Sequence, residues 1–254
     1  MIYACIGDVH GRGSQLQECL NDIIKTKSMT TLPIKTVLLG DYCDRGGENK
    51  LTLDLIIDHK NNYPDSIVLF GNHEELFLGS FMYHKLHKTS ELRTYHRCAN
   101  SVFDIWTYPG NGGNLTYKEF KPLIEEANQN YKNNGIDNFT PYLDFFCSLP
   151  DRVKEGNFVF THAPISQVQY RWSDYHLNRL RSSDVLWNIS TYDTTRKFYN
   201  IHGHLHRYNT ELAEVDHYQK RINCHTAPHL TVTYIDDTKP FESCVIDTFV
   251  SFKY

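Results

Sequence analysis

The sequence contains fourteen histidines among 254 residues, and several of them stand in short clusters with aspartate, asparagine and glycine. Asp8 and His10 are separated by one residue on a turn flanked by glycines, a spacing that can aim both side chains at one point. Carboxylate oxygen and imidazole nitrogen together suit Mn²⁺, Fe or Zn²⁺ better than Ca²⁺, which prefers all-oxygen shells. Such a cluster supplies transition-metal donors, but on its own it is more often a tight turn.

Four more polar clusters follow along the chain, and each comes after a short apolar run. A single such cluster is explained equally well by a tight turn, a helix cap or a buried histidine. Five clusters that all follow apolar runs are not explained by chance, and ligands of open α/β sheets bind where the strands end. The residues concerned are Asp8 with His10, Asp41, Asn72 with His73, His162, and His204 with His206.

The apolar runs predict the strands that carry these clusters. Ile2–Ile6, Thr36–Leu39 and Ser66–Phe70 alternate with segments of helical periodicity, which is typical of βαβ units and a parallel sheet. Strands return after the middle of the chain, and the last two alternate more, which indicates a second sheet with antiparallel members. These later strands are Asn157–Thr161, Phe198–His202, Leu230–Ile235 and Cys244–Val250.

Two further features concern helices. Ser14, with Gln17 three residues later, predicts a capping box at the start of the first helix. The stretch at about 76–149 lacks clear strands, and we interpret it as a mostly helical cap inserted into one domain of residues 1–254. We expect this cap to overhang the strand ends and to select the substrate.

The composition argues against several classes of protein. The formal net charge is −4, so no extended electrostatic footprint for nucleic acid is evident. No stretch reaches the about 20 apolar residues that span a bilayer, so no membrane association is expected. The seven cysteines are scattered without a C-x-x-C pair and the start has no signal-peptide pattern, which together predict a cytoplasmic protein with reduced thiols.

The first three clusters resemble the signature of the serine/threonine phosphoprotein phosphatases, a family within the calcineurin-like metallophosphoesterases. Two later blocks resemble bacterial members and the lambda phage phosphatase, and a phage-encoded protein would act in the host cytoplasm. The resemblance covers most of the chain. The residues that carry it are Gly7-Asp8-Val9-His10-Gly11, Gly40-Asp41-Tyr42-Cys43-Asp44-Arg45-Gly46, Gly71-Asn72-His73-Glu74, Asn111-Gly112-Gly113 and Val185-Leu186-Trp187-Asn188.

The resemblance implies an α/β fold in which two mixed β-sheets pack as a central sandwich flanked by helices. It also implies two divalent ions, for which we expect Mn²⁺, with Fe or Zn²⁺ as alternatives. By position in the motifs, the first ion would be held by Asp8 and His10, both ions by Asp41, and the second by Asn72, His162 and His204.

The same resemblance implies a mechanism. Two ions about 3.5–4 Å apart share a water that loses a proton near neutral pH and attacks phosphorus in line. His73 would protonate the leaving oxygen, and Asp44 would hold the His73 ring as an imidazolium. Arg45 offers a planar fork for two phosphate oxygens. Glu74 has no fixed role, because a carboxylate at a helix start explains it equally well.

The chain departs from the family where arginines would bind phosphate. Phe70 and Ile189 occupy two such positions. Two of the three phosphate-binding arginines are therefore missing, unless Arg179 or Arg181 reaches the site. A phosphomonoester dianion needs more positive charge than a diester monoanion, so this loss weakens the phosphoprotein assignment.

A second departure concerns the last histidines. Gly203-His204-Leu205-His206 resembles the nuclease and phosphodiesterase branch, in which the second histidine binds the first metal, so we expect His206 to be an additional ligand. His225 and His229 lie where family members carry a substrate loop, and the sequence fixes no role for either.

Three hypotheses follow for the function. The first is a phosphatase of phosphomonoesters, phosphoproteins among them. The second is a hydrolase of nucleotides, either symmetrical dinucleoside tetraphosphates or phosphodiesters. The third is a catalytically dead binding module, which the complete ligand set disfavours.

Overall fold

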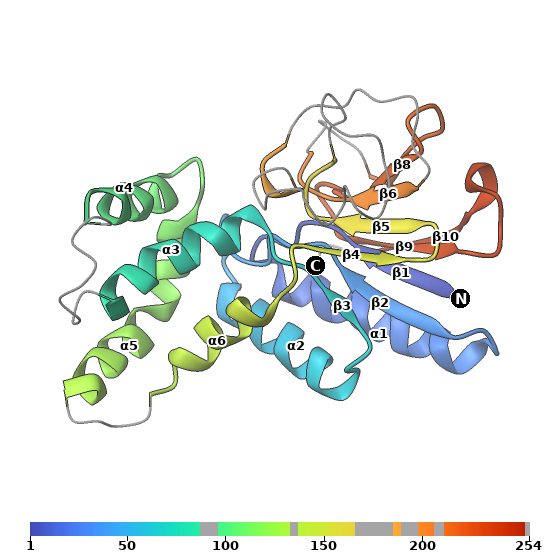
Figure 1. Ribbon diagram of the computed structural model, residues 1–254. Helices are drawn as coiled ribbons and strands as arrows, with labels where there is room; N and C mark the ends of the chain where they lie inside the picture. Colours follow the sequence, from blue (N-terminus) through green and yellow to red (C-terminus); the bar gives the residue numbers. More distant parts are fainter. Residues whose placement is uncertain (87–95, 133–136, 166–184, 189–197, 206–210, 252–254) are drawn as a thin grey trace.

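The computed structural model describes residues 1–86, 96–132, 137–165, 185–188, 198–205 and 211–251. Two five-stranded sheets lie one above the other, with helices on the outside of the first sheet (Figure 1). This arrangement confirms the predicted sandwich of two mixed sheets flanked by helices. In the order β10-β9-β1-β2-β3, the first sheet contains β1 (Ile2–Ile6), β2 (Ile34–Leu38), β3 (Ile67–Val68), β9 (Thr231–Asp236) and β10 (Val245–Val250).

The second sheet has the order β4-β5-β6-β8-β7. Its central strands β5, β6 and β8 are parallel to one another, and the edge strands β4 and β7 are antiparallel to their neighbours. Its members are β4 (Arg152–Glu155), β5 (Phe158–Thr161), β6 (Tyr199–His202), β7 (Glu214–Asp216) and β8 (Arg221–Asn223).

Alternation along β1 divides the interior into two cores. Tyr3 and Cys5 pack between the sheets, against residues that include Phe160 of β5. Ile2, Ala4 and Ile6 instead pack with residues of α1 (Gly13–Met29) and α2 (Asn49–Asn62), which Figure 1 shows along the first sheet. Because side chains of a strand point alternately to opposite faces, a strand covered on both faces is apolar throughout, as β1 is.

The strand predictions were partly wrong. The runs predicted as the last two strands form β9 and β10, which are antiparallel as expected but belong to the first sheet, where β9 pairs with β1. Strands β4, β7 and β8 were not predicted, because each has only three or four residues and contains charged or amide side chains. Such segments lack the apolar periodicity on which the prediction depends.

The predicted capping box at Ser14 is also wrong. Helix α1 begins after Arg12, whose side chain makes no capping hydrogen bond. The Ser14 N–H and Oγ–H both donate to the Glu48 carboxylate, at 2.8 and 2.6 Å, whereas the Gln17 amide donates to Asn21. The carboxylate at this helix start therefore comes from a distant part of the sequence, which local spacing does not reveal.

Between β3 and β4 the described chain is helical. Phe77 packs edge-on against Trp106, Phe120 and Phe146, with ring centroids 5.1–5.9 Å apart. Figure 1 shows these helices extending to one side of the sheets. Their apolar side chains belong to the same core cluster as the residues between the first sheet and helices α1 and α2. The helices are α3 (Asn72–Leu86), α4 (His96–Thr107), α5 (Gly113–Lys132) and α6 (Thr140–Ser148).

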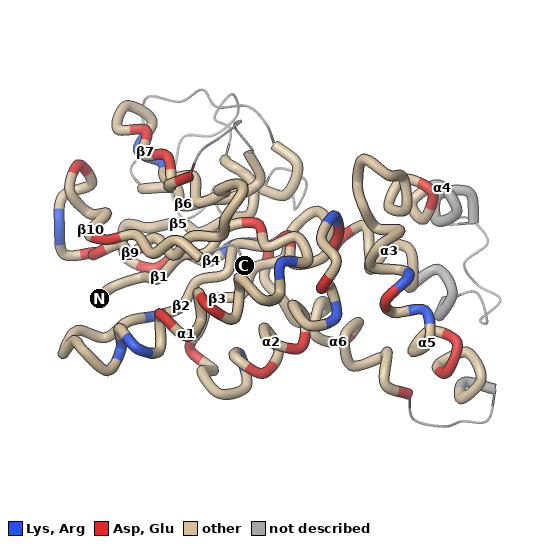
Figure 2. Tube along the Cα trace, turned by 180° about the vertical axis from the view of Figure 1, so that it is seen from behind, with Lys and Arg blue, Asp and Glu red and all other residues tan. Residues whose placement is uncertain are grey.

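Acidic and basic residues are spread over most elements in the view of Figure 2. Among the described residues, no helix has both the length and the apolar character needed to cross a membrane.

Candidate metal centre and catalytic residues

The predicted ligands lie at the carboxyl ends of parallel strands in both sheets. In the first sheet Asp8, Asp41 and Asn72 follow β1, β2 and β3, and in the second His162 and His204 follow β5 and β6. The two groups meet across the sandwich, because the His204 N–H donates to Asp8 Oδ1 at 2.8 Å and His162 Nε2 lies 3.3 Å from Asp41 Oδ1.

Backbone strain is concentrated at the same place. Six described residues other than glycine have a positive φ, and five of them are predicted site residues: His10, Asp41, Asp44, Arg45 and His204, with φ between 47° and 75°. This conformation is unfavourable for side chains with a Cβ and persists only where surrounding contacts enforce it. The fold therefore holds these residues in unfavourable backbone conformations that direct their side chains toward one place.

One group of lone-pair atoms is tightly packed. His162 Nε2 lies 2.8 Å from Asn72 Oδ1 and 3.1 Å from His204 Nδ1, and Asn72 Oδ1 lies 2.9 Å from His204 Nδ1. Metal bonds of about 2.1 Å place adjacent ligand atoms about 3 Å apart. The spacing therefore fits the shell of one cation, and Asp41, His162 and His204 form a possible metal-binding group.

Asp41 faces a second group with its other oxygen. Its Oδ2 lies 3.7 Å from His10 Nε2 and 3.9 Å from His73 Nε2, while Oδ1 faces His162. Asp8 Oδ2 lies 3.8 Å from His10 Nε2. Asp41 could therefore contribute one oxygen to a cation held with His10 and the other to a cation held with His162.

The histidine rings are held so that a lone pair faces the site. His162 Nδ1–H donates to the Leu39 carbonyl at 2.8 Å, and His10 Nδ1–H donates to the Cys43 carbonyl at 3.1 Å. Such carbonyl partners fix the tautomer of metal-binding histidines. The donor set, its spacing and its tautomers all fit a pair of divalent cations.

The charges of the site are strongly coupled. Burial alone would raise the pKa of Asp41, but His162 and His73 outweigh it and hold that pKa well below its usual range. Burial opposes protonation of His162, yet Asp41 raises the pKa of His162 to about 9. Burial, reinforced by His162, lowers the pKa of His204 to about 4. Without cations, a proton on His162 therefore balances part of the carboxylate charge.

His73, Asp44 and Arg45 lie beside these groups. Asp44 Oδ2 accepts a hydrogen bond from His73 Nδ1 at 2.7 Å, and both side chains are almost fully buried. Burial disfavours the His73 cation, but Asp41 and Asp44 together raise the His73 pKa. Arg45 Nη1 donates to His10 Nε2 at 2.8 Å, and Nη2 lies 3.1 Å from His73 Nε2, so the guanidinium contacts one nitrogen of each ring.

The Asp44 carboxylate is held by residues of the 76–149 segment. Trp106 Nε1–H lies 3.0 and 2.9 Å from its two oxygens, and Thr116 Oγ1–H donates to Oδ1 at 2.6 Å. The Asp44 N–H in turn lies 3.0 Å from Thr116 Oγ1 and 2.7 Å from Asn49 Oδ1. Sequence reasoning missed Trp106 and Thr116, although both stand close to the Asn111-Gly112-Gly113 block that it identified.

The same segment approaches the site at two further points. Gly112 has a φ of +79°, and a Cβ there would lie 2.4 Å from the Arg45 nitrogen, so only glycine fits. Glu119 of α5 accepts hydrogen bonds from the Asn49 and Lys50 N–H groups at 3.1 and 2.9 Å, which caps the N-terminus of α2. Residues 76–149 thus contribute to the structure of the site.

We expect Trp106→Phe to lower the free energy of unfolding by about 1.5–3 kcal/mol, because it removes a buried hydrogen bond to a charged acceptor. The aromatic ring remains to pack against Phe77. Urea unfolding measures the change. The matched control is Trp187→Phe, where the indole donates to Glu75 at an exposed position and the change should stay within about 0.5 kcal/mol. An equal loss in both variants would contradict this account of Trp106.

Glu74, left open by the sequence, is fully buried and organises the Asp41 turn. Its carboxylate accepts hydrogen bonds from the backbone N–H groups of Asp41 and Tyr42, each at 2.8 Å, and of Gly71 at 3.1 Å. Burial and the nearby Asp41 raise the pKa of Glu74 to about 7. These contacts give Glu74 a structural role in placing Asp41.

The remaining predictions have mixed outcomes. Phe70 is partly buried and packs against the apolar core. Arg179, Arg181, Ile189 and His206 lie outside the described residues, so the predicted role of His206 as a ligand stays a prediction.

The structure places an unassigned histidine against the site. His225 Nδ1 lies 2.8 Å from Asp8 Oδ2, and its side chain is buried. His225 follows β8, so prediction of that strand would have placed it at the same sheet edge as the predicted ligands His162 and His204. His229 lies on the same loop and is partly exposed.

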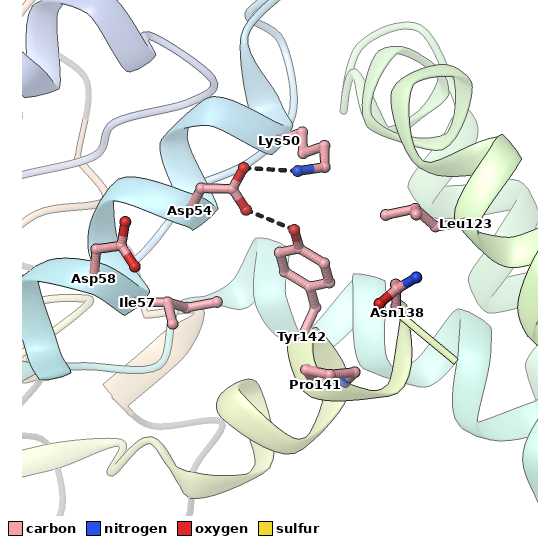
Figure 3. A pocket seen from close by; sticks show the side chains of 8 residues that line it. All are labelled: Lys50, Asp54, Ile57, Asp58, Leu123, Asn138, Pro141 and Tyr142. Carbon is pink, nitrogen blue, oxygen red and sulfur yellow. Dashed lines mark hydrogen bonds and ion pairs between the residues drawn. The ribbon is translucent and has the colours of Figure 1, made fainter. Parts of the chain in front are cut away.

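A hollow of about 560 Å³ lies between α2 and the 76–149 segment (Figure 3). Asp54 lies at its wall and accepts hydrogen bonds from Lys50 at 2.7 Å and from the Tyr142 hydroxyl at 2.5 Å. None of the predicted site residues lines this hollow, so it is separate from the candidate metal centre.

Comparisons with solved structures show related folds. Three solved structures share the fold at low identity. A protein serine/threonine phosphatase from Saccharomyces cerevisiae with similarity to human phosphatase PP5 is 14% identical with a TM-score of 0.57, and the match covers 100% of this chain and 81% of that one. A cold-active protein-tyrosine phosphatase of a psychrophilic Shewanella is 13% identical with a TM-score of 0.53, covering 99% and 80%. A protein assigned as a diadenosine tetraphosphatase is 12% identical with a TM-score of 0.50, covering 100% and 95%.

Identities this low show a common fold and leave the substrate open. The family relationship rests on the sequence itself, which matches the family model of the calcineurin-like phosphoesterases over residues 1–208. Membership of that family makes the chain a metal-dependent phosphoric ester hydrolase. The chain belongs to the calcineurin-like phosphoesterase family.

Proposed function

We propose that this protein is a two-metal phosphatase of phosphomonoesters, of the serine/threonine protein phosphatase type. The observation that carries the proposal is the position of Asp41, whose two oxygens face two separate groups of ligand atoms. Beside it lie a buried histidine–aspartate pair and an arginine. In this proposal residues 1–254 form one metallophosphoesterase domain, and residues 76–149 are its cap.

Each site residue has a proposed role. Two divalent cations, Mn²⁺ by preference, would supply an activated water and neutralise charge on the phosphate oxygens. His73 donates a proton from Nε2 to the leaving oxygen, while Asp44 keeps the ring charged and oriented. Arg45 turns its guanidinium to the phosphate. The proposed ligands are Asp8, His10, Asp41, Asn72, His162 and His204, with His206 as a further candidate.

Metal loading should depend on pH. The pKa of His162 is raised to about 9 before cations bind, and a cation needs the neutral imidazole, so loading displaces a proton. Below pH about 9 the apparent affinity for Mn²⁺ should fall about tenfold for each pH unit. Calorimetric titration in buffers of different ionisation enthalpy measures the released proton. An affinity that is constant between about pH 6 and 8 would contradict the proposed role of His162.

A panel of substrates tests the assignment. Mn²⁺-loaded protein is assayed with a serine phosphopeptide, p-nitrophenyl phosphate, bis-p-nitrophenyl phosphate and diadenosine tetraphosphate. We expect the monoesters to react faster than the bis-ester. A faster rate with the bis-ester or with the dinucleotide would reverse the assignment. His73→Gln is measured in parallel, and a reduced rate in that variant shows that the activity belongs to this site.

One observation favours a second candidate, a hydrolase of nucleotides. Phe70 occupies a position where the resemblance calls for a phosphate-binding arginine, and it packs against the core. Among the described side chains close to His10 and His73, Arg45 is the cation in contact with both rings. Fewer cations suit a diester or an internal phosphate, which carries one negative charge, better than a dianion.

A further inference from the structure

His225 lies in a position equivalent to that of two proposed ligands. Strands β5, β6 and β8 are adjacent and parallel, and His162, His204 and His225 each follow the end of one of them by one or two residues. The second sheet thus presents a histidine from each of three neighbouring strands at the same edge. The first sheet presents an Asp, an Asp and an Asn from β1, β2 and β3 in the same manner.

The backbone brings the loop after β8 unusually close to the Asp8 turn. A Cβ on Gly7 would lie 2.3 Å from the Cys224 carbonyl oxygen and 2.8 Å from the His225 nitrogen, so only glycine permits the approach. The Cys224 N–H donates to the His202 carbonyl, and the His225 N–H donates to Asn223 Oδ1 at 3.1 Å. These contacts fix the His225 backbone beside Asp8.

The His225 side chain reaches the oxygen of Asp8 that faces the first metal position. Its Nδ1 lies 2.8 Å from Asp8 Oδ2, and the same oxygen lies 3.8 Å from His10 Nε2. The rings of His10 and His225 have centroids 6.1 Å apart. The other oxygen, Asp8 Oδ1, already accepts the His204 N–H, so the carboxylate is oriented without His225.

We infer that His225 is a nitrogen ligand of the first metal, beside Asp8 and His10. This inference rests on the proposed two-metal function. The 2.8 Å separation between Nδ1 and Oδ2 is close to the about 3 Å expected for neighbouring ligand atoms of one cation. An imidazole here would give the first position an uncharged donor that favours transition metals over Mg²⁺.

Cysteine substitution gives a direct test. In metal-depleted protein reloaded with Co²⁺, His225→Cys should produce a thiolate-to-cobalt charge-transfer band in the near ultraviolet, because a thiolate at position 225 would bind the ion. The wild type, with its own buried cysteines, gives the baseline. His229→Cys is the matched control on the same loop and should give no such band. Absence of the band from folded His225→Cys would overturn the inference.

Metal stoichiometry supplies a second measurement. We expect wild-type protein to bind two Co²⁺ per chain, and His225→Ala to bind one with unchanged affinity and the other at least about 10–100-fold more weakly. Circular dichroism establishes that the variants are folded. Two ions bound by His225→Ala with wild-type affinities would refute the role of His225 alone, whereas fewer than two ions in the wild type would refute the proposed function itself.

Discussion

Asp41→Asn is expected to remove one of the two cations and to lower kcat/KM by about 10³-fold. The substitution keeps the volume of the side chain but replaces one of the two oxygens that face the ligand groups by an NH₂ group, and it removes the charge between them. A cation that stabilises the transition state contributes several kcal/mol, and each 1.36 kcal/mol corresponds to about a tenfold rate.

Metal analysis and steady-state kinetics on the same preparation measure both effects of Asp41→Asn. The matched control is Asp54→Asn, a carboxylate of α2 that contacts Lys50 and Tyr142 away from the strand ends. That variant should retain two ions. If Asp41→Asn binds two ions with unchanged affinity, the proposed bridging role is wrong.

His73→Gln is expected to lower kcat by about 10²–10⁴-fold with a serine phosphopeptide, because the alkoxide leaving group needs a proton. The loss should be much smaller with p-nitrophenyl phosphate, whose leaving group is stable as an anion. The comparison of the two substrates therefore separates proton donation from a general disturbance of the site.

Metal content provides the discriminating control for His73. His73 lies within ligand distance of His10 and Asp41, so the geometry also permits it as a ligand. A general acid can be replaced without loss of metal, and His73→Gln should bind two ions. Loss of an ion, with equal rate reductions for both substrates, would show instead that His73 binds metal.

Strand β1 could be predicted from the sequence because it is buried on both faces and is therefore apolar throughout. Ile2–Ile6 was predicted with its observed limits. The second sheet was predicted less well, because strands such as Arg221–Asn223 are short and polar and are stabilised by pairing with distant segments. This also affected the site: without β8, nothing in the sequence indicated that His225 lies at the sheet edge that carries the proposed ligands.

The convergence of the proposed ligands was predictable because parallel strands bring their polar ends to one edge, whatever the loops between them. The residues around Asp44 were not, because Trp106 and Thr116 are more than sixty residues away in sequence and look like ordinary core residues. No local spacing relates an indole in α4 to a carboxylate after β2.

The attachment of Asp44 to Trp106 and Thr116 bears on how new specificities could arise in this protein. A chimera that receives the helical segment of a relative would lose the indole and hydroxyl donors unless the graft carries both, together with a glycine at position 112. An exchanged helical segment must therefore keep these three positions if Asp44 and Arg45 are to keep their contacts.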